Sequence, residues 1–190
     1  MGSELAMDLL KKDFDLIHDI APGKHFYQFY KSSEDLLRVL IPYWEAGVRK
    51  NNFCFWVIPA FMNVGDAKTV LRAHIRNIDE LVRIGKFEIV PHVDWYGDGK
   101  TFDGDMTIYR YTNKLKEAIS RGFSVMRVAG DTSGFESHLW SDLQAYEKKG
   151  QSQIHMMPCI ALCSYPLHQL RLQQTKDVLD SHHSVLVAKV

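Results

Sequence analysis

The segment that decides the fold is HFYQFYKSSEDLLRVLIPYWEAG, residues 25–47. It opens with an aromatic-rich run over residues 25–30, which is typical of a buried strand. A short polar turn follows, and then an amphipathic helix that Ser33 can cap. Many nucleotide-binding proteins carry their phosphate loop between such a strand and helix. Here the turn is KSSED, residues 31–35, and it contains no glycine.

The same alternation of strand and helix continues to the end of the chain. Apolar runs such as NFCFWVIP, residues 52–59, are typical of strands that are covered on both faces. Further strands are predicted at 52–59, 86–92, 123–130, 155–165 and 184–190, and helices at 64–76, 78–83, 105–120, 135–149 and 166–180. The pattern predicts an α/β three-layer sandwich with a mainly parallel sheet.

Length and charge limit the class of protein. A chain of 190 residues suits one domain, which we place at 21–190 after an N-terminal helical extension, 1–20. Lys plus Arg and Asp plus Glu both number 23, so we expect no direct contact with nucleic acid. No apolar stretch reaches the roughly 18 residues that span a bilayer, and the mixed charges of the N-terminus do not form a signal peptide. We therefore expect a cytoplasmic protein without a membrane partner.

Cysteine and histidine spacing gives no metal motif. The three cysteines, Cys54, Cys159 and Cys163, lie in apolar runs, where buried free thiols are the expected state. Cys159 and Cys163 do not form a CxxC pair. His182 and His183 are adjacent, and neighbours on a strand point to opposite faces, so they make a poor chelate. The sequence therefore predicts no metal site and no cofactor.

Topology predicts where a ligand would bind. In open parallel sheets ligands lie beyond the carboxyl ends of the strands. This rule selects Tyr30 to Ser33 after the first strand, Pro59 to Phe61 after the second, His92 to Tyr96 after the third, Gly130 to Ser133 after the fourth, and Ser164 to Pro166 after the fifth. Within these ranges the predicted ligand-binding residues are Tyr30, Lys31, Ser32, His92, Trp95, Tyr96, Gly130, Asp131, Thr132 and Tyr165. The set is rich in aromatic residues and modest in charge, which favours a small, partly apolar ligand.

Nucleotide binding is weakly supported. The chain has no GxxxxGK[ST] loop, and Glu34 and Asp35 would repel a phosphate at the helix N-terminus. Asp131 could hold Mg²⁺ as a Walker B acid does, but an Asp that orders its own loop is favoured when no phosphate loop is present. The GxSxG elbow of hydrolases and the GxGxxG turn of nicotinamide enzymes are also absent.

The loop over residues 93–104 is rich in Gly and Asp. Because loops beyond strand ends often carry function, Trp95 is expected to cover a pocket there. We expect this loop to become ordered when a ligand binds.

Six motifs in order give the chain a resemblance to a known family. They are HFYQFYKSSEDLLRVLIPYWEAG (25–47), WYGDGKTFDGDMTI (95–108), GFSVMRVAGDTSG (122–134), LQAYE (143–147), ALCSY (161–165) and DVLDSHHSVLV (177–187). Together they resemble the MEDS family, the methanogen/methylotroph sensory domain, over residues 24–190. The motif positions that also lie at strand ends are His25, Tyr30, Trp95, Gly130, Asp131, Glu147 and Tyr165.

The resemblance implies a degenerate RecA/KaiC-like core without a phosphate loop, and no catalytic residue set. It implies a sensory domain for a small molecule, either a hydrocarbon derivative or a C1-related metabolite. Family members often join this domain to a DNA-binding or kinase domain, so we expect output through a regulatory protein partner or a homodimer. Two alternatives remain: a nucleotide-binding ATPase that uses Lys31, Ser32 and Asp131, and a scaffold that binds only protein through residues 1–20.

A thermal-shift titration with Mg-ATP separates the sensor from the ATPase. A site filled at 100 times its dissociation constant would stabilise the protein by about 2.7 kcal/mol. We expect no such shift and no hydrolysis above the blank. A saturable shift that requires Mg²⁺ would favour the ATPase.

Overall fold

The computed structural model describes residue 17 and residues 19–186. The strands are β1 (Lys24–Tyr30), β2 (Phe53–Val57), β3 (Phe87–Val90), β4 (Met126–Asp131), β5 (Cys159–Pro166) and β6 (Ser184–Val185). The helices are α2 (Ser33–Arg49), α3 (Val64–His74), α4 (Ile78–Arg83), α5 (His92–Tyr96), α6 (Gly104–Ser120), α7 (Trp140–Ile154) and α8 (Leu172–Asp180). Most of the predicted extension, 1–20, and the end of the predicted last strand, 187–190, lie outside the described residues.

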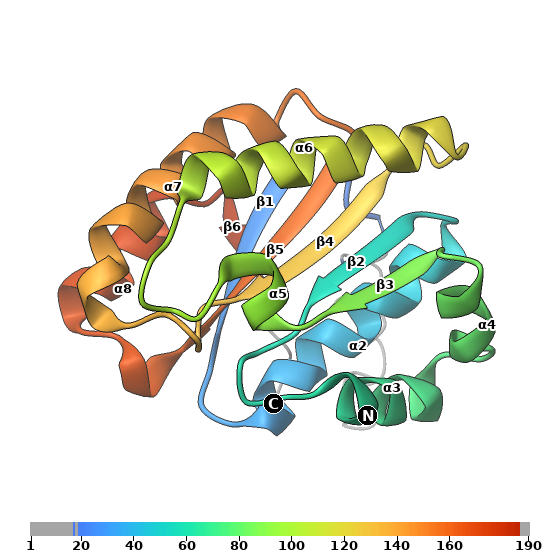
Figure 1. The fold of residues 1–190 in the computed structure, drawn as a ribbon, viewed down its shortest axis with the longest axis horizontal. Helices are drawn as coiled ribbons and strands as arrows, with labels where there is room; N and C mark the ends of the chain where they lie inside the picture. The colour runs from blue at the N-terminus through green and yellow to red at the C-terminus, as the bar shows by residue number, and fades with distance from the viewer. Residues whose placement is uncertain (1–16, 18, 187–190) are drawn as a thin grey trace, which may run out of the picture.

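The described strands form one six-stranded sheet in the order β3-β2-β4-β5-β1-β6. Every pairing is parallel. Helices α2, α3 and α4 lie on one side of the sheet, and α6, α7 and α8 lie on the other (Figure 1). The predicted three-layer α/β sandwich with a parallel sheet is therefore confirmed.

The continuous apolar run of β2 serves both layers. All five residues of the strand are buried. Phe53 and Phe55 pack in the cluster that contains α6 residues, whereas Cys54 and Trp56 pack in the cluster beneath α2. Because successive side chains of a strand point to opposite faces, a strand between two helix layers must be apolar throughout.

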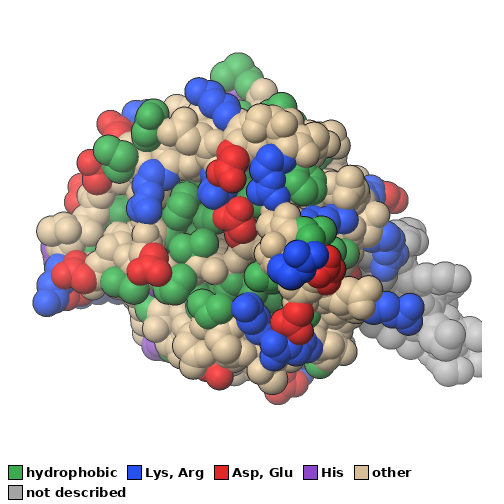
Figure 2. All heavy atoms as spheres, turned by 45° about the vertical axis from the view of Figure 1, so that its right-hand side comes forward, with side chains coloured by type: hydrophobic (Ala, Val, Ile, Leu, Met, Phe, Trp, Pro, Cys, Tyr) green, Lys and Arg blue, Asp and Glu red, His purple; other side chains and the backbone are tan. Residues whose placement is uncertain are grey.

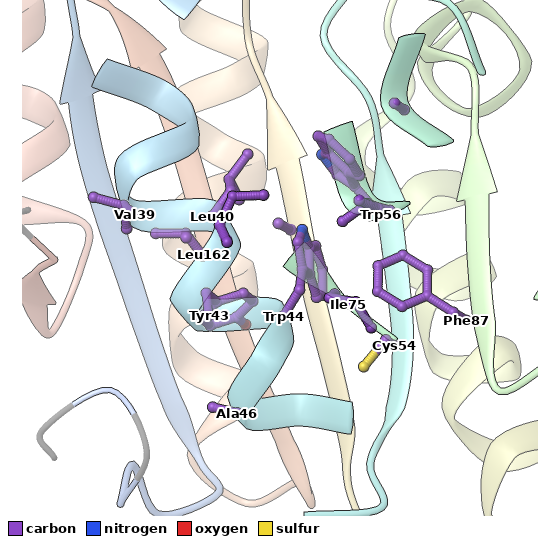
Figure 3. Packing of buried hydrophobic residues seen from close by; sticks show 14 of the residues in the cluster. Val39, Leu40, Tyr43, Trp44, Ala46, Cys54, Trp56, Ile75, Phe87 and Leu162 are labelled. Atoms are coloured by element: carbon purple, nitrogen blue, oxygen red, sulfur yellow. The ribbon is translucent and has the colours of Figure 1, made fainter. Parts of the chain in front are cut away.

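Helix α2 anchors the larger core. Figure 3 shows Tyr43 and Trp44 pointing from α2 toward the sheet. The Trp44 ring lies 5.1 Å from the ring of Phe87 and 6.0 Å from that of Trp56, measured between centroids. The Tyr43 hydroxyl lies 2.9 and 2.8 Å from carbonyl oxygens of β4 and β5. Gly47 lets the helix approach the sheet, because a Cβ there would meet Cys54 Sγ at 2.7 Å.

The start of α2 differs from the sequence prediction, and its middle contains a proline. Ser32, not Ser33, is the N-cap, and its hydroxyl accepts a hydrogen bond from the Asp35 N–H at 3.2 Å. The extended backbone of Ser32 gives it the cap geometry. Proline inside a helix usually bends or interrupts it, yet α2 continues through Pro42 to Arg49. A single proline removes one backbone donor, and the surrounding packing holds the helix together.

Neither positive nor negative side chains dominate the face that Figure 2 shows. Basic and acidic side chains are interspersed there, with hydrophobic side chains between them. This distribution agrees with the formal net charge of zero. None of the described helices combines the length and the apolar composition that a bilayer crossing requires.

Replacing Trp44 by Ala should destabilise the protein by about 3–5 kcal/mol, because the side chain is fully buried between α2 and the sheet. Leu172→Ala is the matched control, since this side chain is 90% exposed, and it should change stability by less than about 0.5 kcal/mol. Urea unfolding measures both. A loss below about 1 kcal/mol for Trp44→Ala would contradict the packing of α2 described above.

Candidate functional site

A pocket lies between the sheet and the helices α6 and α7. Its floor is made by residues of β4 and β5, and its roof by the inner sides of the two helices. Its cavity volume is about 70 Å³. Apolar side chains make most of the wall: Ile108, Leu115, Met126, Val128, Ile154, Met157 and Ala161. The pocket thus lies on one face of the sheet, within the sandwich.

Four side chains with metal-ligand chemistry meet beside this pocket. We call His25, Glu147, Cys163 and His182 the His–Glu–Cys cluster. They come from β1, α7, β5 and the segment after α8. Glu147 Oε2 lies 3.4 Å from His25 Nε2 and 3.6 Å from His182 Nε2. Cys163 Sγ lies 3.3 Å from His25 Nε2 and 3.6 Å from Glu147 Oε2.

Hydrogen bonds at the other ring nitrogens orient both imidazoles. His182 Nδ1 lies 2.8 Å from the Val178 carbonyl oxygen, and His25 Nδ1 lies 3.0 Å from Gln151 Oε1. A carbonyl oxygen only accepts hydrogen bonds, so each Nδ1 carries the hydrogen. The Nε2 atoms of His25 and His182 therefore direct lone pairs into the cluster. His182 Nε2 is buried and has no hydrogen-bond partner among the described residues.

Burial sets the protonation of the cluster. It holds the pKa of His25 well below its ordinary value and lowers the pKa of His182 to about 4, so both imidazoles are neutral and their contacts with Glu147 are not ion pairs. Burial raises the pKa of Glu147 to about 7, although the Tyr165 hydroxyl donates to Glu147 Oε1 at 2.8 Å. Burial and the nearby Glu147 raise the pKa of the Cys163 thiol well above its ordinary value.

Tyrosine hydroxyls extend the polar part of the pocket. Gly130 pairs with Cys163 across the sheet, and Tyr96 reaches over Gly130 so closely that a Cβ at this position would collide with its hydroxyl. The hydroxyls of Tyr96 and Tyr111 lie 2.8 Å apart. Burial raises the pKa of both phenols, so both remain hydrogen-bond donors. The rest of the pocket wall is mostly apolar, so the pocket has one polar end and one apolar end.

The end of β4 is a structural turn. Asp131 Oδ1 accepts the Ser133 N–H at 2.8 Å, which orders the loop in the way that the sequence favoured. Burial raises the pKa of Asp131 from its ordinary value of 3.8 to about 6. Burial and the nearby Asp131 raise the pKa of Tyr30 as well. The Thr132 hydroxyl donates to the Ser164 carbonyl oxygen at 3.2 Å.

The turn before α2 is occupied by its own side chains. Lys31 and Ser32 are exposed. The Lys31 N–H donates to Asp35 Oδ2 at 3.3 Å, and Ser32 caps the helix through the Asp35 N–H. A carboxylate therefore stands at the helix N-terminus, where a phosphate would have to bind.

The predicted loop over residues 93–104 is partly helical. Helix α5 covers His92–Tyr96, and Trp95 is only 7% exposed. Its ring packs 4.7 Å from Phe55 and 4.8 Å from Tyr111, so it is a core residue and does not line the pocket. Burial lowers the pKa of His92 to about 4. Phe55 of the apolar strand β2 packs against Trp95, and this contact holds the segment in the core.

The structure divides the predicted ligand-binding residues into two groups. His25, Tyr96, Gly130 and Glu147 line the pocket. The others do not line it: Tyr30, Lys31, Ser32, His92, Trp95, Asp131, Thr132 and Tyr165. Sequence reasoning missed Cys163, His182 and Tyr111, because it paired Cys163 with Cys159 and His182 with His183. Nothing in the sequence SHHS, residues 181–184, indicates that His182 contacts Glu147 in the folded protein.

The chain is similar to one protein family and, in structure, to two solved proteins. A family model described as "MEDS: MEthanogen/methylotroph, DcmR Sensory domain" matches residues 24–183. The crystal structure of the flagellar accessory protein FlaH from Methanocaldococcus jannaschii aligns with a TM-score of 0.59 and 13% identity, covering 91% of this chain and 75% of FlaH. The cytoplasmic domain of EssC aligns with a TM-score of 0.39 and 10% identity, covering 86% and 31%. No curated protein sequence matches the chain.

At this identity the likeness to FlaH concerns the fold alone. FlaH is RecA-like, and the predicted RecA-like core is therefore confirmed.

The raised pKa of Asp131 predicts a change in the pH dependence of stability. The folded state binds this proton more tightly than the unfolded state, so the contribution of Asp131 to wild-type stability falls as pH rises from about 4 to about 6, by about 3 kcal/mol in total. Asp131→Asn mimics the protonated form. Its stability relative to wild type should therefore increase by about that amount over the same interval.

Urea unfolding at several pH values measures this difference. Asp142→Asn, at an exposed position of α7, controls for the loss of one negative charge. A constant difference between Asp131→Asn and wild type from pH 4 to 7 would show that Asp131 is not held in a raised-pKa environment.

Proposed function

Because the chain belongs to the MEDS family of sensory domains, we propose that it is a receptor module in which a small molecule occupies the pocket beneath α6 and α7. The observation that carries this proposal is the composition of the pocket, whose apolar wall ends in hydroxyl, carboxyl, imidazole and thiol groups. Pockets of this kind bind small ligands, with a few polar groups fixing the orientation. Its role is binding, not catalysis.

The ligand class follows from the two ends of the pocket. A short hydrocarbon part would lie against Met126, Val128 and Leu115, and a polar end would face Glu147 and Cys163. A hydrocarbon derivative or a C1-related metabolite with one polar group has this character. A nucleoside triphosphate does not, because the wall offers no lysine or arginine to its charge.

Signal output would pass through α6 and α7, because these helices form the roof of the pocket. A ligand changes their position only if it binds two arrangements of the roof with different affinity. The receiving molecule would be a regulatory protein or a second copy of this chain. The cytoplasm suits such a receptor, since its three cysteines are free thiols.

Straight-chain alcohols from ethanol to n-hexanol are suitable probes for the pocket. In methyl-labelled protein, the methyl signals of Ile108, Leu115 and Val128 should shift saturably, because these side chains line the pocket. The methyl signals of Ile84 and Leu172, which are exposed and do not line it, should stay unchanged. Affinity should increase with chain length until the apolar part of the pocket is filled.

Gly150→Met tests the location of binding. A Cβ at Gly150, which lines the pocket, meets no atom within 4 Å, so the added side chain has room to occupy this space. We expect at least tenfold weaker alcohol binding, which corresponds to about 1.4 kcal/mol. Ser152→Met adds the same side chain at an exposed position of α7 and should leave binding unchanged. Equal affinities for Gly150→Met and wild type, or shifts spread over all methyl groups, would refute the proposal.

A further inference from the structure

The His–Glu–Cys cluster has the geometry of a metal site. In a tetrahedral zinc site with bonds of about 2.0–2.3 Å, the ligand atoms lie about 3.3–3.6 Å from one another. Four of the six separations between ligand atoms of the cluster are 3.3, 3.4, 3.6 and 3.6 Å. All four ligand atoms lie within 4.8 Å of one another. Four of the six pairs of donors are therefore already spaced as a small cation requires, and the other two pairs lie close enough to reach the same ion.

The lone pairs also converge. His182 Nε2 is an acceptor with no hydrogen-bond partner among the described residues, and its side chain is fully buried. An unpartnered buried acceptor costs free energy that a cation would recover. A proton on Glu147 could satisfy only one of the two imidazole lone pairs that face it. A cation at the centre would satisfy His25, His182, Glu147 and Cys163 at once.

The surroundings of the donors match the outer shell of metal sites. Metal-binding histidines usually donate their second ring N–H to a carbonyl or carboxylate, and ligating carboxylates are themselves hydrogen-bonded. Here the carbonyl oxygens of Val178 and Gln151 accept from the two Nδ1 atoms. The Tyr165 hydroxyl donates to Glu147 Oε1, which leaves Oε2 free for the cluster.

We propose that His25, Glu147, Cys163 and His182 bind one Zn²⁺ ion. Two imidazoles, a thiolate and a carboxylate in a tetrahedral arrangement suit zinc among the common divalent metals. Binding displaces the thiol proton of Cys163 and any proton on Glu147 into solvent. The charges of thiolate, carboxylate and Zn²⁺ sum to zero, as a buried site requires. The ion joins β1, α7, β5 and the segment after α8.

Elemental analysis and cobalt spectroscopy test the site in the full chain. Protein expressed with added zinc and purified with a reductant should contain one zinc per chain, and a chelator should remove the zinc and lower Tm. Protein loaded with Co²⁺ should show the visible bands of a tetrahedral ion and a thiolate-to-cobalt charge-transfer band. Metal-free protein that takes up neither Zn²⁺ nor Co²⁺ overturns the proposal, whatever the variants do.

Variants identify the ligands. His182→Gln and Cys163→Ala should lose zinc, and Cys163→Ala should lose the charge-transfer band. The matched controls are His74→Gln, at an exposed histidine of α3, and Cys159→Ala, at a buried cysteine of the same strand as Cys163; both should keep one zinc. Tyr165→Phe should weaken zinc binding by about 10–100-fold.

Loss of zinc from the controls to the same extent as from the ligand variants would also refute the site. The zinc site shares Glu147 and Cys163 with the pocket of the proposed receptor. Its test does not depend on that function, because zinc content is measured without a small molecule.

Discussion

The alternation of side chains along β5 is the constraint on which the molecule depends. Cys159, Ala161 and Cys163 face α6 and α7, whereas Ile160 and Leu162 face α2. Parallel pairing with β4 and β1 fixes the register of the strand on both sides. A slip of one residue would exchange the two faces, placing the Cys163 thiol in the α2 core and Leu162 in the pocket. One register thus specifies both a core and a site.

The helix layer that contains α2 and the one that contains α6 and α7 pack against the sheet in different ways. Under α2 the packing is aromatic and continuous, with Trp44 in contact with both Trp56 and Phe87. Under α6 and α7 the packing is interrupted by a pocket and by buried polar groups. Buried polar groups weaken a fold unless they are paired, so a stable second layer allows the protein to keep them. The layer beneath α2 provides that stability.

Sequence reasoning predicted the features that depend on neighbouring residues and missed those that depend on distant ones. The apolar run of β2 and the strand–turn–helix at residues 25–47 predicted the sheet and its layers, and the MEDS resemblance was confirmed. The strand-end rule found Tyr96 and Gly130, but it pointed to an edge, while the pocket lies on a face. The glycine and aspartate content around Trp95 predicted a loop, whereas His92–Tyr96 form a short helix in which Trp95 packs against Phe55.

The sequence by itself determined the fold class, because apolar periodicity and helix capping depend only on residues close together in the chain. It determined the lack of a phosphate loop as well, since the glycines would have to be contiguous with residues 31–35. Only the tertiary structure decided that His25, Glu147, Cys163 and His182 meet. These residues belong to four separate elements, and contacts between distant segments depend on register and helix placement, which local patterns do not encode.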